Sequence, residues 1–298
     1  MSGPRLKLAV QKSGRLTDPS LDLLSRCGLK LARGKDQLLG FGENLPLDVL
    51  FVRDDDIPDL VEEDVCDLGL VGLNVLEEKR LALAAQGGEA RYATLRTLDF
   101  GRCRLALAVP AQMPWEGVAG LAGRRIATSY PHLLTRFLAE RDLSAHIVTL
   151  SGAVEIAPRL GRADLICDLI STGSTLAANH LREVETVLES HAVLIRTPVP
   201  LEAAKAEWVE RLLQRIDGVQ QVRESKYIML HAPRSALPDI RRLLPGSETP
   251  TVIPLEGCAE RVAVHAVCRE NVFWETLESL KQAGASALLV LPVEKMLG

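Results

Sequence analysis

Short apolar runs alternate with amphipathic stretches through most of this chain. The run LKLAV at 6–10 predicts a buried strand, and the apolar spacing of 19–27 predicts a helix after it. The same order returns in the strand-like PLDVLFVR at 46–53 and the helix-like IPDLVEEDVC at 57–66. Strands that alternate with helices are typical of an α/β fold, so we expect a largely parallel sheet here.

A second block repeats this order further along the chain. We expect a strand, a helix, a strand, a helix and a strand at 124–129, 131–141, 146–150, 154–161 and 163–170. In both blocks a helix with a polar end is followed by an aspartate and then an apolar strand, and Asp67 and Asp164 are the matching residues. This weak internal repeat predicts two similar α/β lobes with a ligand in the cleft between them.

The last part of the chain has a different pattern. A helix over Glu202–Asp217, ended by Gly218, is expected to pack back on the first lobe. Next come a strand, a helix, two strands, a helix and a strand at 226–231, 235–244, 251–255, 261–267, 271–284 and 287–292. This βαββαβ order is ferredoxin-like, and without an obvious nucleophile or metal cluster it indicates a sensor domain. We therefore predict a first lobe at 1–98 with 192–223, a second at 99–191, and a C-terminal domain at 224–298.

Composition narrows the class of protein. Of the 298 residues 47% are hydrophobic and 25% charged, and the net charge is −4, as expected for a soluble globular protein. No window holds the ~18 apolar residues of a membrane helix, and the N-terminus lacks a signal-peptide core, so we expect a cytoplasmic protein without a membrane partner. The absence of a basic stripe argues against nucleic acid. Six scattered cysteines without a C-x-x-C pair predict reduced thiols.

The stretch S-T-G-S-T at 171–175 joins a predicted strand to a predicted helix. Its backbone N–H groups and the helix dipole would attract a phosphate, Gly173 would allow a close approach, and four hydroxyls would add donors, from Ser171, Thr172, Ser174 and Thr175. Asp168, near the end of the strand, can accept hydrogen bonds from two ribose hydroxyls. The alternative is a serine-capped helix without a ligand. The strand–turn–helix context together with Asp168 favours phosphate binding.

A second candidate site is the turn QKSGR after the first strand. Lys12 and Arg15 flank Ser13 and Gly14 at the carboxyl edge of the sheet, where α/β proteins bind ligands. From the residues alone, two solvated cations on a surface turn are the favoured alternative. Arg53 also ends a strand at the presumed cleft.

Three acids and one further glutamate deserve separate interpretations. The run Asp54–Asp56 offers carboxylates to Mg²⁺, but acids at a helix N-terminus are the preferred interpretation. Glu155 opens the predicted helix before the phosphate-loop strand, where it can bind ribose or cap the helix.

Several of these stretches resemble one known family. CDLISTGSTL resembles the phosphoribosyl pyrophosphate loop of phosphoribosyltransferases, with Cys167 in place of the first of two acids. The longer GAVEIAPRLGRADLICDLISTGSTL is similar to the signature of ATP phosphoribosyltransferases, which open histidine biosynthesis. Further similar segments are QKSGRL at 11–16, VRDDDIPDLV at 52–61, DLGLVGLNVLEE at 67–78 and RIATSYPHLL at 125–134. The tail, from RESKYIMLHAP to GASALLVLPVEKML, resembles the regulatory domain of the long form.

The resemblance implies a fold and a reaction. The fold would be a two-lobed core of the periplasmic-binding-protein type followed by an ACT-like domain. The reaction would convert ATP and phosphoribosyl pyrophosphate to phosphoribosyl-ATP and pyrophosphate, with Mg²⁺ as cofactor. The implied roles are catalysis by Lys12 and Arg15, phosphoribosyl pyrophosphate binding by Glu155, Asp168 and Ser171–Thr175, and ATP binding by Ser13, Gly14 and Arg53. The metal ligands stay unassigned.

The resemblance also implies regulation. Histidine would act as feedback inhibitor between neighbouring regulatory domains, and matching positions point to His231, Thr249 and Ala287. The protein would be a homo-oligomer, a dimer and a hexamer. The alternative from the residues alone is a two-lobed binding or sensor protein without catalysis. A receptor needs one anion pocket, whereas the transferase needs Lys12–Arg15 opposite Ser171–Thr175.

Overall fold

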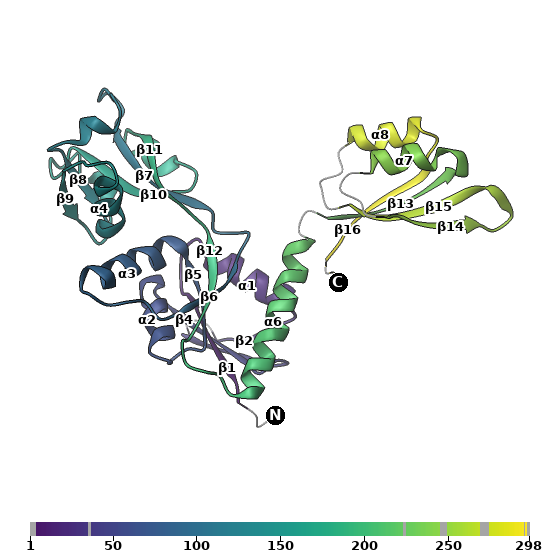
Figure 1. Ribbon diagram of the computed structural model, residues 1–298, viewed down its shortest axis with the longest axis horizontal. Coiled ribbons are helices and arrows are strands. Elements are labelled where there is room, and N and C mark those ends of the chain that lie inside the picture. Colours follow the sequence, from purple (N-terminus) through teal and green to yellow (C-terminus); the bar gives the residue numbers. More distant parts are fainter. Residues whose placement is uncertain are drawn as a thin grey trace. The chain divides into compact units, whose positions relative to one another are not determined.

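The protein divides into two compact units. The computed structural model describes residues 4–34, 37–222, 225–244, 249–268, 274–294 and 296. One unit comprises Met1–Ser25 with Leu29–Ala206, and the other comprises Arg26–Gly28 with Glu207–Gly298. The first unit holds two lobes, each built on its own sheet (Figure 1). The predicted boundary at 223 and 224 lies outside the described residues.

The first lobe is a seven-stranded sheet. Its strands are β1 (Leu6–Gln11), β2 (Leu31–Ala32), β3 (Leu39–Gly42), β4 (Leu47–Val52), β5 (Leu68–Gly72), β6 (Ala93–Thr97) and β12 (Ala192–Arg196). They lie in the order β2-β3-β4-β1-β5-β12-β6, with β1 parallel to both β4 and β5. The chain returns to this sheet late, because β12 pairs antiparallel with β5 and β6.

Three helices follow strands of this lobe: α1 (Thr17–Arg26), α2 (Ile57–Glu62) and α3 (Leu73–Ala85). Helices α2 and α3 lie along one face of the sheet (Figure 1), where Ile57 and Val75 join Ala9 and Val71 in one apolar cluster. Leu8, Ala9 and Val10 of β1 are all fully buried, so both faces of this strand are covered, as its apolar run predicts.

The second lobe is a five-stranded sheet. Its strands are β7 (Cys103–Pro110), β8 (Arg125–Thr128), β9 (His146–Thr149), β10 (Leu165–Ile170) and β11 (Leu181–Ser190). Their order is β11-β7-β10-β8-β9, with β10 parallel to β8 and antiparallel to β7. The remaining elements of this lobe are α4 (Pro131–Ala139), α5 (Ser174–Ala178) and the 3₁₀ turns η2 (Val118–Leu121) and η3 (Val154–Ile156).

The prediction of a helix at 154–161 is wrong, because only the short 3₁₀ turn η3 forms there. Ala153 before it has φ +50°, and Gly161 at its end has φ +66°, both outside the right-handed helical region. Pro158 between them has no N–H to continue a helical ladder. The segment is a turn whose Val154 and Ala157 pack in the core on one face of the sheet.

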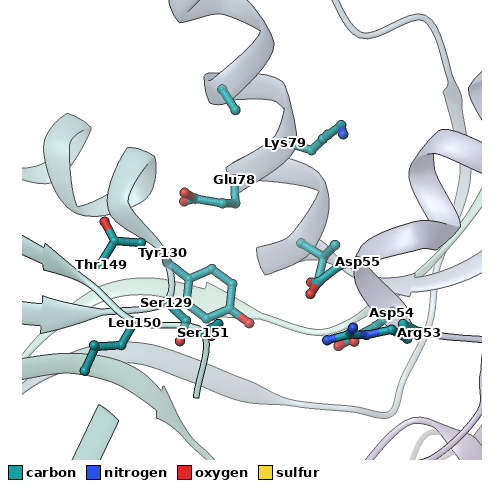
Figure 2. Close-up of a pocket in the computed structure, with 12 residues that line it drawn as sticks. Arg53, Asp54, Asp55, Glu78, Lys79, Ser129, Tyr130, Thr149, Leu150 and Ser151 are labelled. Atoms are coloured by element: carbon teal, nitrogen blue, oxygen red, sulfur yellow. The ribbon is translucent and has the colours of Figure 1, made fainter. Parts of the chain in front are cut away.

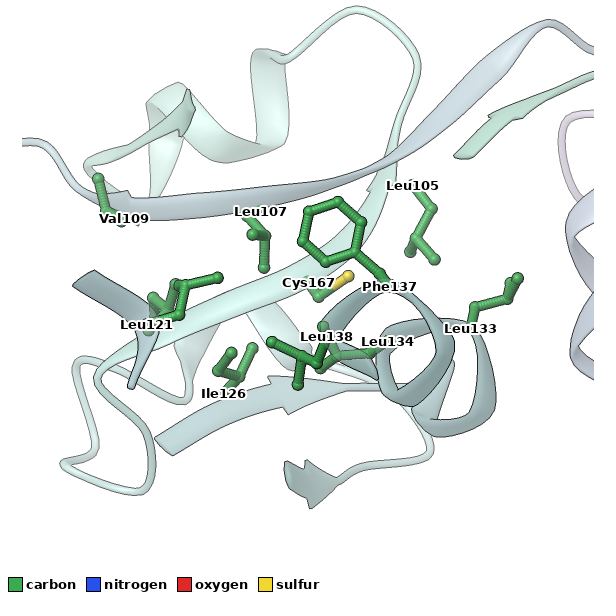
Figure 3. Close-up of a cluster of buried hydrophobic side chains, with 11 residues drawn as sticks. Leu105, Leu107, Val109, Leu121, Ile126, Leu133, Leu134, Phe137, Leu138 and Cys167 are labelled. Atoms are coloured by element: carbon green, nitrogen blue, oxygen red, sulfur yellow. The ribbon is translucent and has the colours of Figure 1, made fainter. Parts of the chain in front are cut away.

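Side chains of β7 and β10 alternate between two apolar cores. Leu105, Leu107 and Cys167 belong to the core that includes Phe137 of α4 (Figure 3). Ile166 and Ile170 belong to the core on the opposite face, which also contains residues of η3 and α5. Since strand side chains alternate with period two, Asp168 shares the face of Ile166 and Ile170. The fold therefore directs Asp168 toward η3 and α5.

The predicted match between Asp67 and Asp164 is confirmed in three dimensions. Asp67 Oδ2 accepts the N–H of Lys7 at 2.8 Å, and Asp164 Oδ2 accepts the N–H of Arg125, also at 2.8 Å. Each aspartate thus joins the start of one strand to the start of the parallel strand beside it.

The second unit begins within α6 (Ala203–Gln221), which continues past Gly218. The prediction that Gly218 ends this helix is wrong. A glycine inside a helix costs only about 1 kcal/mol, which the burial of flanking Ile216 and Val219 offsets.

The C-terminal domain has the predicted βαββαβ order. Its elements are β13 (Lys226–Pro233), η4 (Arg234–Ala236), α7 (Leu237–Leu243), β14 (Thr251–Leu255), β15 (Cys258–Cys268), α8 (Trp274–Gln282) and β16 (Ser286–Pro292). The sheet order β14-β15-β13-β16 places the first and third strands at the centre, and α7 and α8 lie on one face of the sheet (Figure 1). The ferredoxin-like prediction is confirmed.

Two expectations about the chain as a whole can be checked on the structure. All six cysteines are reduced thiols, as predicted. Among the described residues, no helix combines the length and the apolar character needed to cross a membrane.

Candidate functional site

The loop between β10 and α5 forms one wall of a cavity of about 270 Å³, which we call the loop cavity. Its lining consists of Glu155, Asp168, Leu169, Ile170, Ser171, Thr172, Gly173, Thr175 and Leu176. Gly173 has φ +79°, and no atom lies within 4 Å of the place where a Cβ would stand. The backbone is therefore open to close approach by a ligand, as the sequence predicts.

The loop has only a weak side-chain cap. Gly173, the N-cap residue of α5, has no side chain that could cap the helix, and Thr172 Oγ1 accepts the N–H of Ser174 at 3.5 Å. Thr172 Oγ1 lies 3.0 Å from Ser174 Oγ, so these hydroxyls contact each other at the surface. No serine caps α5 from the N-cap position, which Gly173 occupies, and the one hydroxyl contact at the helix start is the long one from Thr172. Of the four hydroxyl residues, Ser171, Thr172 and Thr175 line the loop cavity.

Two carboxylates, Glu155 of η3 and Asp168 of β10, line the loop cavity. Burial raises the pKa of Asp168 to about 6, although its Oδ1 accepts the N–H of Leu169 at 2.8 Å, and the charge of Glu155 adds to the rise. Asp168 is therefore ionised at neutral pH and able to accept hydrogen bonds from hydroxyl groups. The predicted pair of Glu155 and Asp168 is brought together.

Cys167 faces away from the loop cavity. Its side chain is fully buried in the core beneath α4 with Leu134 and Phe137 (Figure 3). Burial raises the pKa of its thiol, so it stays neutral. An acid at this position would lie in an apolar core, which gives a physical reason for a cysteine there.

A second cavity of about 600 Å³ lies between the two lobes, and we call it the interlobe cavity (Figure 2). Its lining from the first lobe is Arg53, Asp54, Asp55, Val75, Glu78, Lys79 and Ala82. Its lining from the second lobe is Ser129, Tyr130, Thr149, Leu150 and Ser151. Arg53 therefore lies at the cleft, as predicted, with a second cation, three acids and several hydroxyls around it.

The acids Asp54–Asp56 form a 3₁₀ turn, η1, directly before α2. Their place at a helix start agrees with the preferred interpretation, but none of their side chains caps the helix. Asp54 and Asp55 instead line the interlobe cavity, where burial first and the charge of Asp54 second raise the pKa of Asp55. Within the described residues, no group of three or more His, Cys, Asp or Glu could hold a metal ion.

The predicted basic turn connects β1 to α1. Lys12, Ser13 and Gly14 are exposed, and Gly14 has φ +131°. Gln11 shapes the turn, because its Oε1 accepts the N–H of Leu16 at 3.0 Å and its side chain would lie 2.7 Å from a Cβ on Gly14. No sequence pattern singles out Gln11, since its role depends on how the chain folds back on it.

Arg15 is half-buried and tied to a buried network. Its Nη2 donates to Oδ1 of Asn74 at 2.9 Å, and the same oxygen accepts the hydroxyl of Ser190 at 2.8 Å. Asn74 Nδ2 donates to the hydroxyl oxygen of Tyr130 at 2.9 Å. Burial raises the pKa of Tyr130, so its own hydroxyl proton stays available. The Asn74 side chain thus connects Arg15 to Tyr130 in the wall of the interlobe cavity.

The structure brings some predicted residues together and leaves others apart. Glu155, Asp168 and all of the Ser171–Thr175 loop except Ser174 line the loop cavity, while Arg53 lies in the interlobe cavity. The described lining of neither cavity includes the turn 12–15. The opposition of Lys12–Arg15 to Ser171–Thr175 therefore stays a prediction.

Asn74 and Glu78 are functional candidates that the sequence analysis missed. Both lie in the quoted segment DLGLVGLNVLEE, but only their contacts with the other lobe single them out. Glu78 Oε1 and Oε2 accept the N–H groups of His132 and Leu133, each at 2.8 Å. In the sequence, the resemblance of that segment to the family is the signal that could have pointed to these two residues.

The three residues proposed for histidine are spread over the C-terminal domain. His231 of β13 pairs with Ser286 across a register shift between β13 and β16, and Ala287 follows directly with φ +48°. His231 and Ala287 are therefore neighbours at an irregular sheet edge. Thr249 is exposed just before β14 on the other side of the sheet order, so it is not brought beside them.

Comparison with known proteins gives consistent matches. A family model described as ATP phosphoribosyltransferase matches residues 53–218, and a model for the C-terminal domain of the same family matches 223–295. Among solved structures, the ATP phosphoribosyl transferase (HisG:HisZ) complex from Thermotoga maritima is 27% identical, with a TM-score of 0.57, and the match covers 71% of this chain and 98% of that chain. The alkanesulfonate-binding protein SsuA from Xanthomonas axonopodis pv. citri, bound to MOPS, is 19% identical with a TM-score of 0.46, over 74% and 75% of the two chains.

Proposed function

The chain belongs to the ATP phosphoribosyltransferase family, and from that premise we propose how its own residues carry out the transfer. The enzyme is a pentosyltransferase of histidine biosynthesis that joins ATP to phosphoribosyl pyrophosphate. The products are 1-(5-phosphoribosyl)-ATP and pyrophosphate. A two-lobed binding protein without catalysis is not favoured, because both family matches and the similar solved enzyme point to the transferase.

We propose that phosphoribosyl pyrophosphate binds in the loop cavity. The observation that carries this assignment is the open Ser171–Thr175 loop facing the same cavity as two carboxylates. The 5-phosphate would accept hydrogen bonds from the loop N–H groups and hydroxyls. Asp168 and Glu155 would accept from the ribose hydroxyls, which fixes the sugar beside the phosphate.

We propose that ATP binds in the interlobe cavity. Its volume of about 600 Å³ lies within the usual range for small-molecule sites. Arg53 would supply positive charge for phosphates together with Lys79, whose ammonium also pairs with Asp59 at 2.8 Å, and Ser129 and Tyr130 would supply hydroxyls from the wall of the second lobe. Ser13 and Gly14 would complete the site from the β1–α1 turn, whose exposed backbone can approach a nucleotide.

Chemistry needs alignment and charge stabilisation rather than a covalent enzyme intermediate. Adenine N1 forms a bond to the ribose C1 carbon, while the C1–O bond breaks and pyrophosphate leaves with its electron pair. Holding the reactants on two lobes of one unit removes an entropic barrier that reaches several kcal/mol in favourable cases. Lys12 and Arg15 would stabilise the negative charge on the leaving group.

Mg²⁺ is part of this proposal as a partner of the substrates. When bound, it would neutralise charge on the pyrophosphate oxygens. The described residues offer no three-ligand cluster, whereas Asp54 and Asp55 place two carboxylates in the interlobe cavity. Mg²⁺ held mainly by substrate phosphates fits that donor set.

We further infer that the protein is cytoplasmic and forms homo-oligomers, namely a dimer and a hexamer. We also infer that histidine inhibits it by binding to the C-terminal domain. The match of 223–295 to the C-terminal domain model supports this inference, as do His231 and Ala287 side by side at a sheet edge. Sedimentation with and without histidine tests it. Inhibition with unchanged assembly would confine the switch to a conformational change within one oligomer.

The first test is an assay of the whole reaction. Purified protein is mixed with ATP, phosphoribosyl pyrophosphate, Mg²⁺ and pyrophosphatase, and phosphoribosyl-ATP is followed by its ultraviolet absorbance. Product formation that histidine suppresses is the expected result. Product indifferent to histidine would keep the transferase and remove the regulatory role of the tail. If the folded protein binds phosphoribosyl pyrophosphate but forms no product, the alternative of a binding protein without catalysis would be favoured.

Arg15→Ala tests the proposed role of the basic turn. We expect strongly reduced kcat with an unchanged circular dichroism spectrum, because Arg15 is proposed to stabilise the leaving group. Near-normal turnover in the folded variant would remove Arg15 from the mechanism.

A further inference from the structure

Helix α3 presents two different faces to its surroundings. Val75 and Leu76 are buried in the core of the first lobe. Asn74, Glu77 and Glu78 instead make hydrogen bonds to Tyr130, Arg136 and the start of α4, all in the second lobe. One helix therefore joins the two lobes that enclose the interlobe cavity.

The contact of Glu78 has an unusual form, because a carboxylate of one lobe caps a helix of the other. The first N–H groups of a helix have no partner within it, and α4 receives no side-chain cap from its own N-cap residue, Tyr130. Glu78 meets this need with both carboxylate oxygens, one to the N–H of His132 and one to that of Leu133, each at 2.8 Å. Hydrogen bonds to an ionised acceptor, aligned with a helix dipole, are among the stronger polar contacts.

The capped end of α4 is also the wall of the interlobe cavity. Ser129 and Tyr130, which immediately precede the helix, line the cavity together with Glu78 itself (Figure 2). Asn74, which lies on α3 like Glu78, donates a hydrogen bond to the hydroxyl of Tyr130. The position of this wall relative to Arg53 and Lys79 therefore depends on the bridge from Glu78 to α4.

We propose that Glu78 is a positioning residue. By capping α4 from the other lobe, it would hold the cavity wall at Ser129 and Tyr130 in the position that the nucleotide needs. The identity of the nucleotide as ATP rests on the proposed function. The loop cavity is lined by residues of the second lobe alone, between Glu155 and Leu176. Binding of phosphoribosyl pyrophosphate there should not depend on the bridge, which gives the proposal a clear signature.

The neighbouring Glu77 provides a matched control. It also reaches α4, but through the side chain of Arg136 at 3.2 Å, and it shares its charge with Arg80 at 2.8 Å. The side chains of Arg80, Arg136 and Glu77 are 48%, 29% and 23% exposed, and ion pairs that water reaches contribute little. Glu77→Gln and Glu78→Gln make the same charge change on adjacent residues of one helix, but only the second takes one of the two acceptor oxygens and the negative charge away from the cap.

The test compares these two variants in the full-length protein. Hydrogen exchange followed by NMR or mass spectrometry reports on the amides of His132 and Leu133 without any substrate. We expect about tenfold faster exchange and about tenfold weaker ATP binding in Glu78→Gln, the effect of losing roughly one charge-assisted hydrogen bond. Phosphoribosyl pyrophosphate affinity should stay within about twofold in both variants, and Glu77→Gln should resemble the wild type.

Each other outcome has a definite meaning. Faster exchange with unchanged ATP binding would reduce Glu78 to a helix cap and overturn the proposal. Equal weakening of both substrates, or faster exchange throughout β10, would indicate general destabilisation and overturn it as well. Because exchange and direct binding need no turnover, a wild-type protein without product would refute the proposed function separately. Should Glu78→Gln not fold, Glu78→Asp keeps the charge with a shorter reach and should give a smaller change in the same direction.

Discussion

The two lobes begin their central strands in the same way and end them differently. Asp67 and Asp164 each precede a strand and accept the N–H at the start of the neighbouring parallel strand. Asp67 is 5% exposed and also accepts two hydrogen bonds from Lys205 Nζ, at 2.8 and 3.0 Å. Asp164 pairs with the guanidinium of Arg125 at the surface. The same local device is thus a buried anchor in one lobe and a solvated contact in the other.

The ends of the two strands differ more. In the first lobe β5 leads directly into α3, whose Asn74 and Glu78 are occupied by contacts with the second lobe. In the second lobe β10 leads into the open Ser171–Thr175 loop and its cavity. The repeated strand therefore marks where a site can form in each lobe. The polar side chains after the strand decide whether its end binds a ligand, as proposed for β10, or joins the lobes, as after β5.

The largest expected effect comes from breaking the buried anchor. Asp67→Ala leaves the Lys205 ammonium and the Lys7 N–H without their partner, and losing one member of a buried pair costs about 3–5 kcal/mol. Chemical denaturation followed by circular dichroism should show this loss in the transition of the first unit. A loss no larger than that of Asp164→Ala would mean that the two anchors contribute alike.

An intermediate effect is expected where β10 meets the proposed substrate. Asp168→Asn removes the charge that would accept the ribose hydroxyls, so kcat/KM for phosphoribosyl pyrophosphate should fall roughly 10- to 100-fold. In the wild type kcat/KM should also decline below about pH 6, as Asp168 becomes protonated, and this decline should be absent in the variant. Unchanged kcat/KM in Asp168→Asn would remove the carboxylate from substrate binding.

The same substitution should stabilise the fold. The pKa of Asp168 is raised from 3.8 to about 6, so the folded state binds the proton more tightly than the unfolded state. Ionisation therefore destabilises the folded protein above about pH 6, by up to about 3 kcal/mol, and the destabilisation disappears as pH falls toward 4. Asp168→Asn should unfold later than the wild type at pH 7, with the difference shrinking at pH 5. Equal stability at pH 7 would indicate that Asp168 is well solvated.

The smallest effect is expected at the exposed anchor. Arg125 holds the pKa of Asp164 below its usual value, mainly through its side-chain hydrogen bond. That stabilisation is present above the unfolded pKa and is lost as pH falls through the lower folded pKa. Since the pair is exposed, Asp164→Ala should cost less than about 1 kcal/mol, and added salt should reduce the difference. A loss comparable to that of Asp67→Ala would contradict the contrast between the lobes.

Much of the fold could be predicted because it depends on local patterns. Apolar periodicity predicts the strands at 6–10 and 163–170 and the βαββαβ order, and the structure has them. The predictions failed where a local signal competed with packing. Gly218 does not end α6, because the burial of its neighbours holds the helix. The segment 154–161 is not a helix, because Pro158 lies within it and left-handed residues, Ala153 and Gly161, stand at its two ends.

The candidate site divides in the same way. The sequence by itself determined the open loop at Ser171–Thr175 and the side of β10 that carries Asp168, because turn chemistry and period-two alternation are properties of adjacent residues. Only the tertiary structure decided that Cys167 is a core residue and that Asn74 and Glu78 serve the second lobe. Glu78 lies 54 positions before His132, so no local pattern records their contact. The partner of a polar side chain is set by which distant surface the fold brings within hydrogen-bond reach.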